Sequence, residues 1–389
     1  MTLEEIRKKH ELVDLFCNLA ETPSPSLHEE KVAEWIKKYC DENEIECKLD
    51  DYGNVFINIP ATDNSKEPLL LSAHMDVIGD DSPVKTYLDD NNCIHAEDRT
   101  LGGDDKAGVA NALLFAKEIA KSKMKHGGLE VLFTRDEESG LTGIRNVNFK
   151  ELKSKYVLVL DSDTLGQCEV AGASYTLAFL NVHSYKGGHS GIDIGDKDRA
   201  NAAKLIADLI SELPQGAFYE ENGKVETSCN LGGIEAGNIK VTNIINTDAK
   251  ASYSIRSSSR KKEQELKDKM SAIVNKFNET HNNIAKASLE FEEHMPPFEK
   301  SDDEYIPILF ETAAKKVGVI PDITTFHAGA ETHIYANETN SKGEKFIPYL
   351  LGLATVCNMH SKNEYLDYTT ILKGHKLLEE LFEIYNKEA

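Results

Sequence analysis

The chain has 389 residues, with 66 Asp and Glu against 44 Lys and Arg, which gives a formal net charge of −22. Nucleic acids and anionic membrane surfaces are themselves negative, so this acid excess argues against both as partners. A chain of this length favours one large domain together with one smaller domain.

The first 170 residues alternate between helix and strand patterns. Residues 1–16 are expected to form an amphipathic helix, and Ser26–Glu29 a capping box that opens a second helix. Two strand-like runs follow, DYGNVFINIP and PLLLSAH, and a further helix is expected after Asp104 and Asp105. LEVLFT and YVLVLD are nearly continuous apolar runs, which is typical of central strands in a parallel sheet. This alternation predicts an α/β sandwich.

A different pattern begins near residue 174. It runs strand, helix, strand, strand, helix, strand, which is the order of the split βαβ, or ferredoxin-like, unit. After a Pro-containing linker, the first pattern returns and ends in a helix at 366–386. We therefore expect a discontinuous domain formed by 1–173 and 296–389, with an α+β domain inserted at 174–295.

Several apolar runs end in a histidine or an acid. Ligands bind beyond the carboxyl ends of strands in open α/β sheets, so residues there can converge although they are distant in sequence. The candidates are His74 and Asp76 after LLLSA, Asp104 and Asp105 after a Gly pair, Glu137 and Glu138 after LEVLFT, Asp161 closing YVLVLD, and His360. Two histidines and three carboxylates suit a pair of cations such as Zn²⁺.

Each signal also has a plain structural alternative. His74 beside Asp76 is by itself typical of a surface histidine, and Asp104 could simply cap a helix. The Asp136–Glu138 run could be a solvated helix start in so acidic a chain. Adjacent acids on an extended segment point in different directions, however, so one can bind a metal while the other takes a proton from water. Occurring together and in this order, the signals favour metal-assisted hydrolysis.

Six motifs carry a resemblance to a known family: SAHMD, LGGDDKAG, FTRDEESGLTG, LDSD, KGGHSGIDI with RANA, and NMHSKNE. In this order the chain resembles the co-catalytic zinc exopeptidases that include peptidase T, a tripeptide aminopeptidase, and the aminoacyl-histidine dipeptidases. The resemblance covers essentially the whole chain. It implies a zinc-exopeptidase α/β sandwich at 1–173 and 296–389 and a ferredoxin-like lid domain at 174–295.

The resemblance also implies two Zn²⁺ ions, with Co²⁺ or Mn²⁺ as substitutes, and a role for each matched residue. The implied metal ligands are His74 and Asp161 for one ion, Glu138 and His360 for the other, and Asp104 as the bridge between them. Glu137 is the implied general base, and Asp76 is expected to orient His74.

Three residues of the inserted domain also match the family, Asn243 and Arg256 more loosely than His189. His189 of GGHSG is implied to polarise the scissile carbonyl, and its structural alternative is a turn residue in a Gly-rich loop. Asn243 in VTNIIN and Arg256 in YSIRS are implied to hold substrate carbonyl or carboxylate groups. Arg suits bidentate capture of a carboxylate, although Arg256 could also be a surface residue in a basic run.

One loop departs from the peptidase T pattern. Residues 326–337 read FHAGAETHIYAN where a GGTDG-like loop is usual, and they resemble the His-Ala-Gly-x-Glu loop of the aminoacyl-histidine dipeptidases. We expect His327 and Glu331 to line the substrate pocket, with Glu331 as a partner for a substrate α-ammonium. Each has a core or loop position as its alternative, and the choice of substrate stays open.

The sequence therefore predicts a dinuclear zinc exopeptidase that cleaves di- or tripeptides from a free N-terminus. An Xaa-His dipeptidase, an N-acyl amino acid deacylase and a metal-free binding protein are the alternatives, and a homodimer is left open beside a monomer. Seven cysteines without a CxxC motif are typical of free thiols in a reducing compartment. With neither a signal peptide nor a transmembrane segment evident, we expect a cytoplasmic protein.

Overall fold

The computed structural model describes residues 1–219 and 224–388, and these divide into two compact units. Unit 1 comprises Met1–Val170, Lys300–Thr325 and Ala330–Ala389. Unit 2 comprises Ala171–Glu299 together with Phe326–Gly329. Unit 2 thus extends past 174–295 at both ends and takes in the His-Ala-Gly segment of the later loop.

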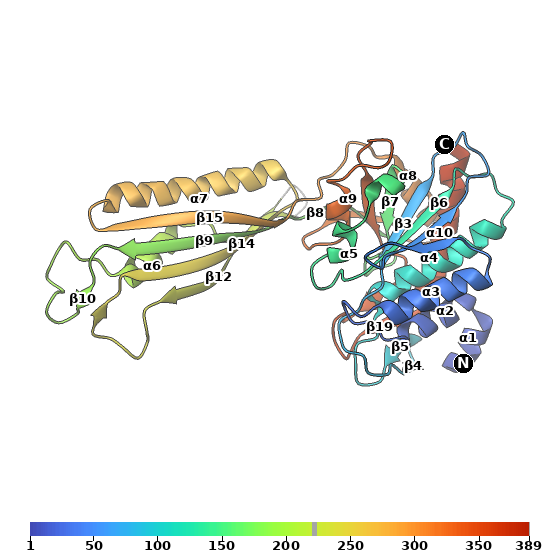
Figure 1. Ribbon diagram of the computed structural model, residues 1–389, viewed down its shortest axis with the longest axis horizontal. Coiled ribbons are helices and arrows are strands. Elements are labelled where there is room, and N and C mark those ends of the chain that lie inside the picture. Colours follow the sequence, from blue (N-terminus) through green and yellow to red (C-terminus); the bar gives the residue numbers. More distant parts are fainter. Residues whose placement is uncertain (220–223, 389) are drawn as a thin grey trace. The chain divides into compact units, whose positions relative to one another are not determined.

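Unit 1 is built on an eight-stranded mixed sheet (Figure 1). In spatial order its strands are β1 (Cys47–Leu49), β2 (Val55–Ile59), β6 (Leu129–Thr134), β3 (Leu69–His74), β7 (Tyr156–Val159), β17 (Ile347–Leu351), β8 (Gln167–Gly172) and β16 (Asp322–Phe326). The four central strands, from β6 to β17, run parallel. Every residue of β3, β6 and β7 is buried, as expected for strands covered on both faces.

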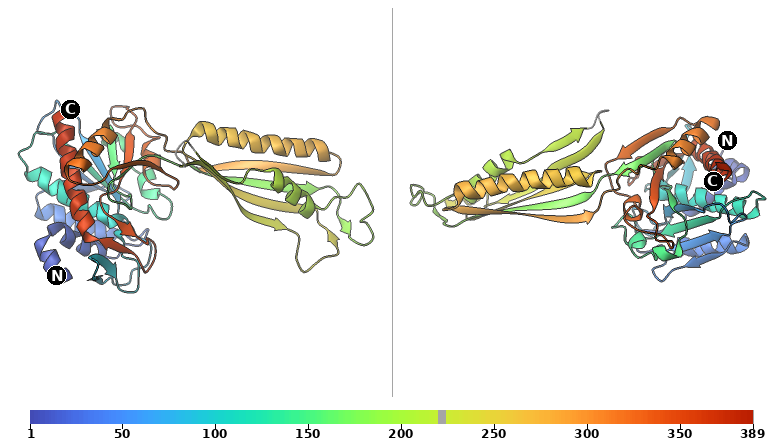
Figure 2. Two further views of the ribbon diagram at one scale, coloured as in Figure 1. Left: turned by 180° about the vertical axis from the view of Figure 1, so that it is seen from behind. Right: turned by 90° about the horizontal axis from the view of Figure 1, so that it is seen from above.

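Helices surround this sheet (Figure 2). They are α1 (Leu3–Lys9), α2 (Glu11–Ala20), α3 (Glu30–Glu42), α4 (Gly103–Lys121), α5 (Thr142–Arg145), α8 (Tyr305–Lys316), α9 (Thr332–Tyr335) and α10 (Tyr368–Glu388), with a 3₁₀ turn at Phe149–Glu151. Apolar residues of α2, α4, α8 and α10 form one continuous core with the sheet. The predicted α/β sandwich is confirmed.

Two local predictions near the N-terminus are wrong. The first 16 residues form two helices, because the chain is extended at His10, which ends α1 and precedes α2. The expected capping box at Ser26–Glu29 is absent: α3 begins at Glu30 without a side-chain cap. Ser26 instead donates its hydroxyl hydrogen to Asp76, so a tertiary contact uses the side chain that the local pattern assigned to a helix end.

A second, four-stranded sheet in unit 1 was not expected from the sequence. Its strands are β18 (Val356–Cys357), β19 (Tyr365–Asp367), β5 (Cys93–Ala96) and β4 (Thr86–Leu88), in that spatial order. Such short strands give little periodicity to detect. The loop between β18 and β19 carries His360.

Unit 2 has a five-stranded antiparallel sheet. Its spatial order is β11 (Gly216–Tyr219), β12 (Val225–Ala236), β14 (Asp248–Ser257), β9 (Tyr175–Ser184) and β15 (Ala285–Met295). The helices α6 (Ala202–Glu212) and α7 (Arg260–His281) share a core with one face of the sheet, so buried and accessible residues alternate along β9 and β14. Without the edge strand β11, this order is that of the predicted ferredoxin-like unit.

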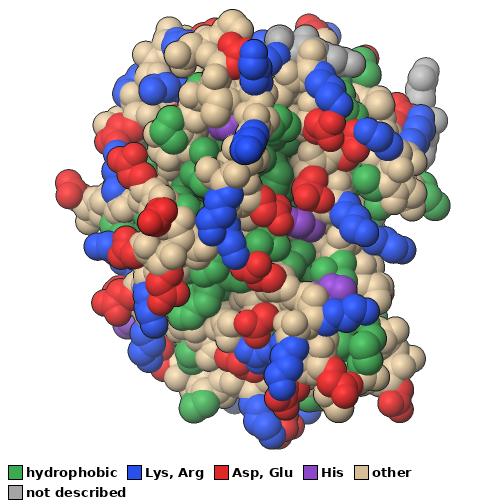
Figure 3. All heavy atoms as spheres, turned by 90° about the vertical axis from the view of Figure 1, so that its right-hand side faces the viewer, with side chains coloured by type: hydrophobic (Ala, Val, Ile, Leu, Met, Phe, Trp, Pro, Cys, Tyr) green, Lys and Arg blue, Asp and Glu red, His purple; other side chains and the backbone are tan. Residues whose placement is uncertain are grey.

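No helix in the described part of the chain is long and apolar enough to cross a membrane. On the face drawn in Figure 3, acidic and basic side chains are interspersed.

Candidate metal centre

Parallel strands bring the predicted ligands of unit 1 to one edge of the large sheet. His74 is the last residue of β3, Asp161 follows β7, and Glu137 and Glu138 follow β6. Because β6, β3 and β7 are parallel neighbours, their carboxyl ends meet at the same edge. Asp104 approaches from the irregular start of α4, where its backbone is not helical.

One group of candidate ligands consists of His74, Asp104 and Asp161. Nε2 of His74 lies 3.0 Å from Oδ1 of Asp104 and 3.6 Å from Oδ1 of Asp161. The histidine is almost fully buried. One atom from each of the three side chains falls within 4.8 Å of the others, which is compact enough to surround a single ion.

A second group consists of Asp104, Glu138 and His360. Nε2 of His360 lies 3.1 Å from Oδ2 of Asp104 and 3.0 Å from Oε1 of Glu138. The two groups therefore share Asp104, and each of its carboxylate oxygens faces a different imidazole. A carboxylate in this position has the geometry of a bridge between two ions.

Several buried carboxylates lie close together in this cluster. Burial and the Asp104 carboxylate raise the pKa of Asp161 well above its ordinary value. Burial also raises the pKa of Glu138 to about 7. Hydrogen bonding to Asp104 raises the pKa of His360 to about 9, and hydrogen bonds to Asp104 and Asp161 raise the pKa of His74 although burial opposes this. The acids thus repel one another, and cations bound among them would relieve that repulsion.

The donor set fits a metal ion. Oε1 of Glu138 is buried, and among the described residues it faces Nε2 of His360 at 3.0 Å without a well-formed hydrogen bond, which leaves an oxygen available for coordination. Two imidazoles and three carboxylates are the ligand types that Zn²⁺ uses, and Co²⁺ and Mn²⁺ accept similar sets.

Asp76 holds three parts of the centre together. Its Oδ1 accepts a hydrogen bond from the Glu137 backbone N–H at 2.9 Å, and its Oδ2 accepts from the Glu138 N–H at 3.1 Å. Nδ1 of His74 lies 3.3 Å from Oδ1 of Asp76. Burial opposes ionisation of Asp76, but these contacts and the Ser26 hydroxyl lower its pKa to about 2. Asp76 therefore positions both acids after β6 as well as His74.

Glu137 is half-buried beside the cluster. Burial raises the pKa of Glu137 well above its ordinary value, and the neighbouring carboxylates of Asp161 and Glu331 add to this effect. A raised pKa in a glutamate is the usual property of a proton acceptor that must later give its proton away.

Asp105 binds backbone N–H groups and belongs to neither group of candidate ligands. It is buried, and its carboxylate accepts hydrogen bonds from the N–H groups of His74 and Gly108. It therefore connects the end of β3 to the first turn of α4.

Two further buried glutamates support the ligand-bearing loops: Glu29, which the sequence pattern predicted only as part of a capping box, and Glu364, for which no role was expected. Glu29 accepts hydrogen bonds from the Asp136 N–H at 3.1 Å and from Nε of Arg135 at 2.6 Å. Glu364, from the NMHSKNE motif, accepts hydrogen bonds from the loop that carries Asp104. Nothing in the local pattern separates either acid from the many exposed ones.

In unit 2, His189 and Asn243 lie on neighbouring segments. His189 belongs to β10 (Gly188–His189), which pairs with β13 (Ile244–Ile245), and the Asn243 carbonyl accepts a hydrogen bond from the Ser190 N–H. Both side chains are exposed. The pair sits beyond the end of β9, where Ser184 N–H donates to the Thr247 carbonyl (Figure 1).

Arg256 and His327 form a different group at the other end of the same sheet. The Arg256 guanidinium lies 4.5 Å from the ring centre of Tyr175, the first residue of β9. Ser228, the cross-strand neighbour of Arg256, has its hydroxyl 2.7 Å from Nε2 of His327. Burial and the nearby Arg256 charge lower the pKa of His327, which favours its neutral form.

Glu331 is buried within unit 1. Its side chain is only 1% exposed, and its Oε2 accepts a hydrogen bond from the Ser72 hydroxyl at 3.0 Å. The Tyr335 hydroxyl donates to the same Ser72 oxygen. Its Oε1 is buried without a hydrogen-bond partner among the described residues, and the contact of Glu331 with a substrate ammonium stays a prediction.

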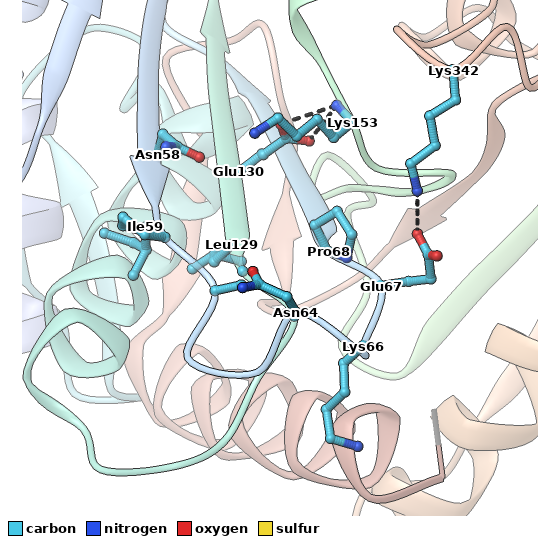
Figure 4. Close-up of a pocket in the computed structure, with 14 residues that line it drawn as sticks. Asn58, Ile59, Asn64, Lys66, Glu67, Pro68, Leu129, Glu130, Lys153 and Lys342 are labelled. Atoms are coloured by element: carbon cyan, nitrogen blue, oxygen red, sulfur yellow. Dashed lines mark hydrogen bonds and ion pairs between the residues drawn. The ribbon is translucent and has the colours of Figure 1, made fainter.

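A separate hollow of about 350 Å³ lies beside the starts of β3 and β6, at the opposite edge of the sheet from the ligands (Figure 4). Its charged side chains include Glu67 and Lys342, which form an ion pair, and Glu130, which accepts from backbone N–H groups of Lys153 and Ser154. None of the predicted site residues lines it.

Comparison with known proteins identifies the class. The profile of peptidase family M20/M25/M40 matches residues 70–384, so the chain belongs to this family of metallopeptidases. Peptidase T of Brevibacillus brevis is 26% identical over 300 residues, which cover 74% of this chain and 66% of that protein. The predicted family resemblance is confirmed.

Solved structures agree on the fold. The crystal structure of aminopeptidase PepT from Bacillus cereus superposes with a TM-score of 0.84 at 23% identity, covering 96% of this chain and 98% of that one. Aminoacylhistidine dipeptidase from Vibrio alginolyticus gives a TM-score of 0.72 at 22% identity, covering 96% of each chain.

Proposed function

We propose that this peptidase is a dinuclear zinc exopeptidase that removes residues from the free N-terminus of di- and tripeptides. One observation carries the proposal: the Asp104 carboxylate lies between two imidazoles, with a further acid beside each of them. His74 and Asp161 would hold one ion, Glu138 and His360 the other, and Asp104 would bridge them. Co²⁺ or Mn²⁺ could replace Zn²⁺ in this donor set.

When bound, two such ions polarise the scissile carbonyl and make the attacking water more acidic. Glu137 takes the proton from that water and passes it to the departing amine. Its half-buried position next to Glu138, whose Oε1 faces His360, supports this division of labour. Asp76 keeps both acids in place through their backbone N–H groups and fixes the ring orientation of His74.

Arg256 is proposed to bind the C-terminal carboxylate of the peptide. Its guanidinium is stacked on Tyr175 and so keeps its planar edge defined for a bidentate contact. His327 lies beside it as a neutral imidazole and would provide a hydrogen bond without a second positive charge. A binding site for the carboxylate of the last residue would limit the length of the peptide.

His189 is proposed to contact the scissile carbonyl as an oxyanion donor, and Asn243 beside it to hold a substrate carbonyl or carboxylate group. Within unit 2 they lie at the opposite end of β9 from Arg256, and β9 has ten residues. That length corresponds to about 30 Å, whereas an extended tripeptide spans about 10 Å. A rotation of unit 2 as a rigid lid moves both groups together and cannot close this gap. We therefore propose a homodimer in which each site receives His189 from the partner.

Two other activities are compatible with the same centre. The His-Ala-Gly-x-Glu loop favours an Xaa-His dipeptidase as the second candidate. An N-acyl amino acid deacylase would use the same ions and Glu137 but no substrate amine. We also propose a cytoplasmic location, which the seven free cysteines support.

Exchanging the two neighbouring acids one at a time tests their roles. Glu137→Gln should lower kcat by about 10²–10⁴-fold while the metal content stays near that of the wild type, because only the proton acceptor is lost. Glu138→Gln should lose metal, because it removes a ligand oxygen. Turnover with a di- or tripeptide and elemental analysis of the dialysed proteins measure both effects. Wild-type turnover in Glu137→Gln would remove Glu137 as the base.

A panel of blocked substrates tests which end of the peptide is recognised. N-acetylation of a good substrate should abolish cleavage, because the acid-rich centre then loses an attractive ammonium group. C-terminal amidation should mainly raise KM, and this penalty should disappear in Arg256→Gln. Faster turnover of N-acetylated amino acids than of free dipeptides would establish the deacylase, and strict selectivity for Xaa-His would establish the second candidate.

Mixing two inactive variants tests the shared site. His189→Ala and Glu137→Gln chains, co-expressed in equal amounts, should recover about a quarter of wild-type activity, because half of the dimers are mixed and each mixed dimer has one complete site. The control pair is Glu137→Gln with Asp104→Ala. Each site takes both residues from one chain, so a mixed dimer of these variants has no complete site and activity should not recover. An inactive mixture of the first pair would contradict donation of His189 by the partner.

A further inference from the structure

The loop that carries Asp104 is folded around the carboxylate of Glu364. Oε2 of Glu364 accepts hydrogen bonds from the N–H groups of Leu101 at 2.8 Å and Gly102 at 3.0 Å, and from the Thr100 hydroxyl. Oε1 accepts from the Gly103 N–H at 2.7 Å. Only 1% of Glu364 is exposed, so these bonds are shielded from water. Successive N–H groups that converge on one anion form a rigid, nest-like turn.

The glycines of this loop make the close approach possible. Gly102 has φ of +75°, a conformation that side chains disfavour. A Cβ atom on Gly103 would lie 3.2 Å from Oε1 of Glu364 and 2.9 Å from Cγ1 of Val356. The Gly pair before Asp104 therefore serves the contact with Glu364 as well as the bend of the chain.

Glu364 belongs to the same loop as His360. This loop joins β18 to β19, and internal hydrogen bonds close it, including Ser361 Oγ to the Asn358 carbonyl and the Glu364 N–H to the Ser361 carbonyl. Glu364 thus connects the loop of one candidate ligand directly to the loop of another. Its carboxylate accepts hydrogen bonds from four successive residues, Thr100 to Gly103, and its Oε1 also lies 3.5 Å from the Asp104 backbone nitrogen.

The two halves of the centre differ in how much they need this support. His74 and Asp161 sit at the ends of adjacent parallel strands, whose positions the sheet determines. His360 stands on a loop with half of its side chain exposed, and its backbone has φ of +59°. Its distance from Asp104 is set by the contact between the two loops.

We propose that Glu364 is a positioning residue that holds Asp104 and His360 at the spacing needed for the ion of the Asp104–Glu138–His360 group. This inference rests on the proposed dinuclear function. Glu364 would determine how tightly one of the two ions is bound. Loss of the carboxylate should weaken that ion most, because two of its ligands, Asp104 and His360, lose their support, and should weaken the ion held by His74 and Asp161 less, because only Asp104 is affected there.

The test is a Co²⁺ titration of the metal-depleted full-length protein, with bound metal counted by equilibrium dialysis and followed by visible absorption. The wild type should bind two ions. Glu364→Gln should bind the ion of the Asp104–Glu138–His360 group about 10–100-fold more weakly, as is usual when a residue that supports a ligand is changed, and the ion of the His74 group more weakly by a smaller factor. Excess Co²⁺ should restore most of its turnover, because Glu364 does not touch the reacting atoms.

Glu130→Gln is the matched control. Glu130 is also a buried glutamate that accepts backbone N–H groups, those of Lys153 and Ser154, but it lies at the opposite edge of the sheet (Figure 4). Its exchange should lower the melting temperature to a similar extent without changing either cobalt affinity. A general loss of stability is thereby separated from a loss of positioning.

The milder variant Thr100→Val removes one donor to Glu364 and is used if Glu364→Gln does not fold. It should weaken the ion of the Asp104–Glu138–His360 group in the same direction by a smaller factor. Two ions bound with wild-type affinity by the folded Glu364 variant, or by Thr100→Val in its place, would overturn the inference and leave the proposed function intact. A wild type that binds fewer than two ions would instead contradict the proposed function.

Discussion

The carboxylate of Asp104 is the point on which the site depends. Its two oxygens lie 3.0 Å and 3.1 Å from the imidazoles of His74 and His360, which come from a central strand and from a distant loop. The Asp104 carboxylate therefore lies between the two histidines. The parallel strands provide a fixed edge for one half of the cluster, and the second sheet of unit 1 brings the remaining histidine to it.

Buried carboxylates that bind backbone N–H groups hold the ligands in place. Residues beyond a strand end have lost their sheet partners, and buried N–H groups need new ones. Asp76 serves the segment after β6, Glu29 serves the residue before it, and Glu364 serves the loop of Asp104. Each of them accepts hydrogen bonds from backbone N–H groups that would otherwise lack a partner at an irregular turn. The acid excess of the chain is therefore partly structural.

Much of this architecture could be predicted from local patterns. Continuous apolar runs identified the central strands, and alternation with a fixed element order identified the ferredoxin-like unit. Parallel strands end at the same edge of a sheet, so the strand pattern alone predicted that His74 and Asp161 lie at one edge. The remaining features depend on tertiary contacts: Ser26 bonds to Asp76 instead of capping a helix, and Glu331 is buried against Ser72. The support from Glu364 links residues that are more than 250 positions apart, which no local window can detect.

The most direct measurement of the central claim is anomalous scattering from crystals grown with zinc. The account predicts two peaks about 3.5–4 Å apart on either side of the Asp104 carboxylate. One should lie next to His74 and Asp161, and the other next to Glu138 and His360. A fully loaded crystal with a single ion, or with two ions that do not share Asp104, would contradict it.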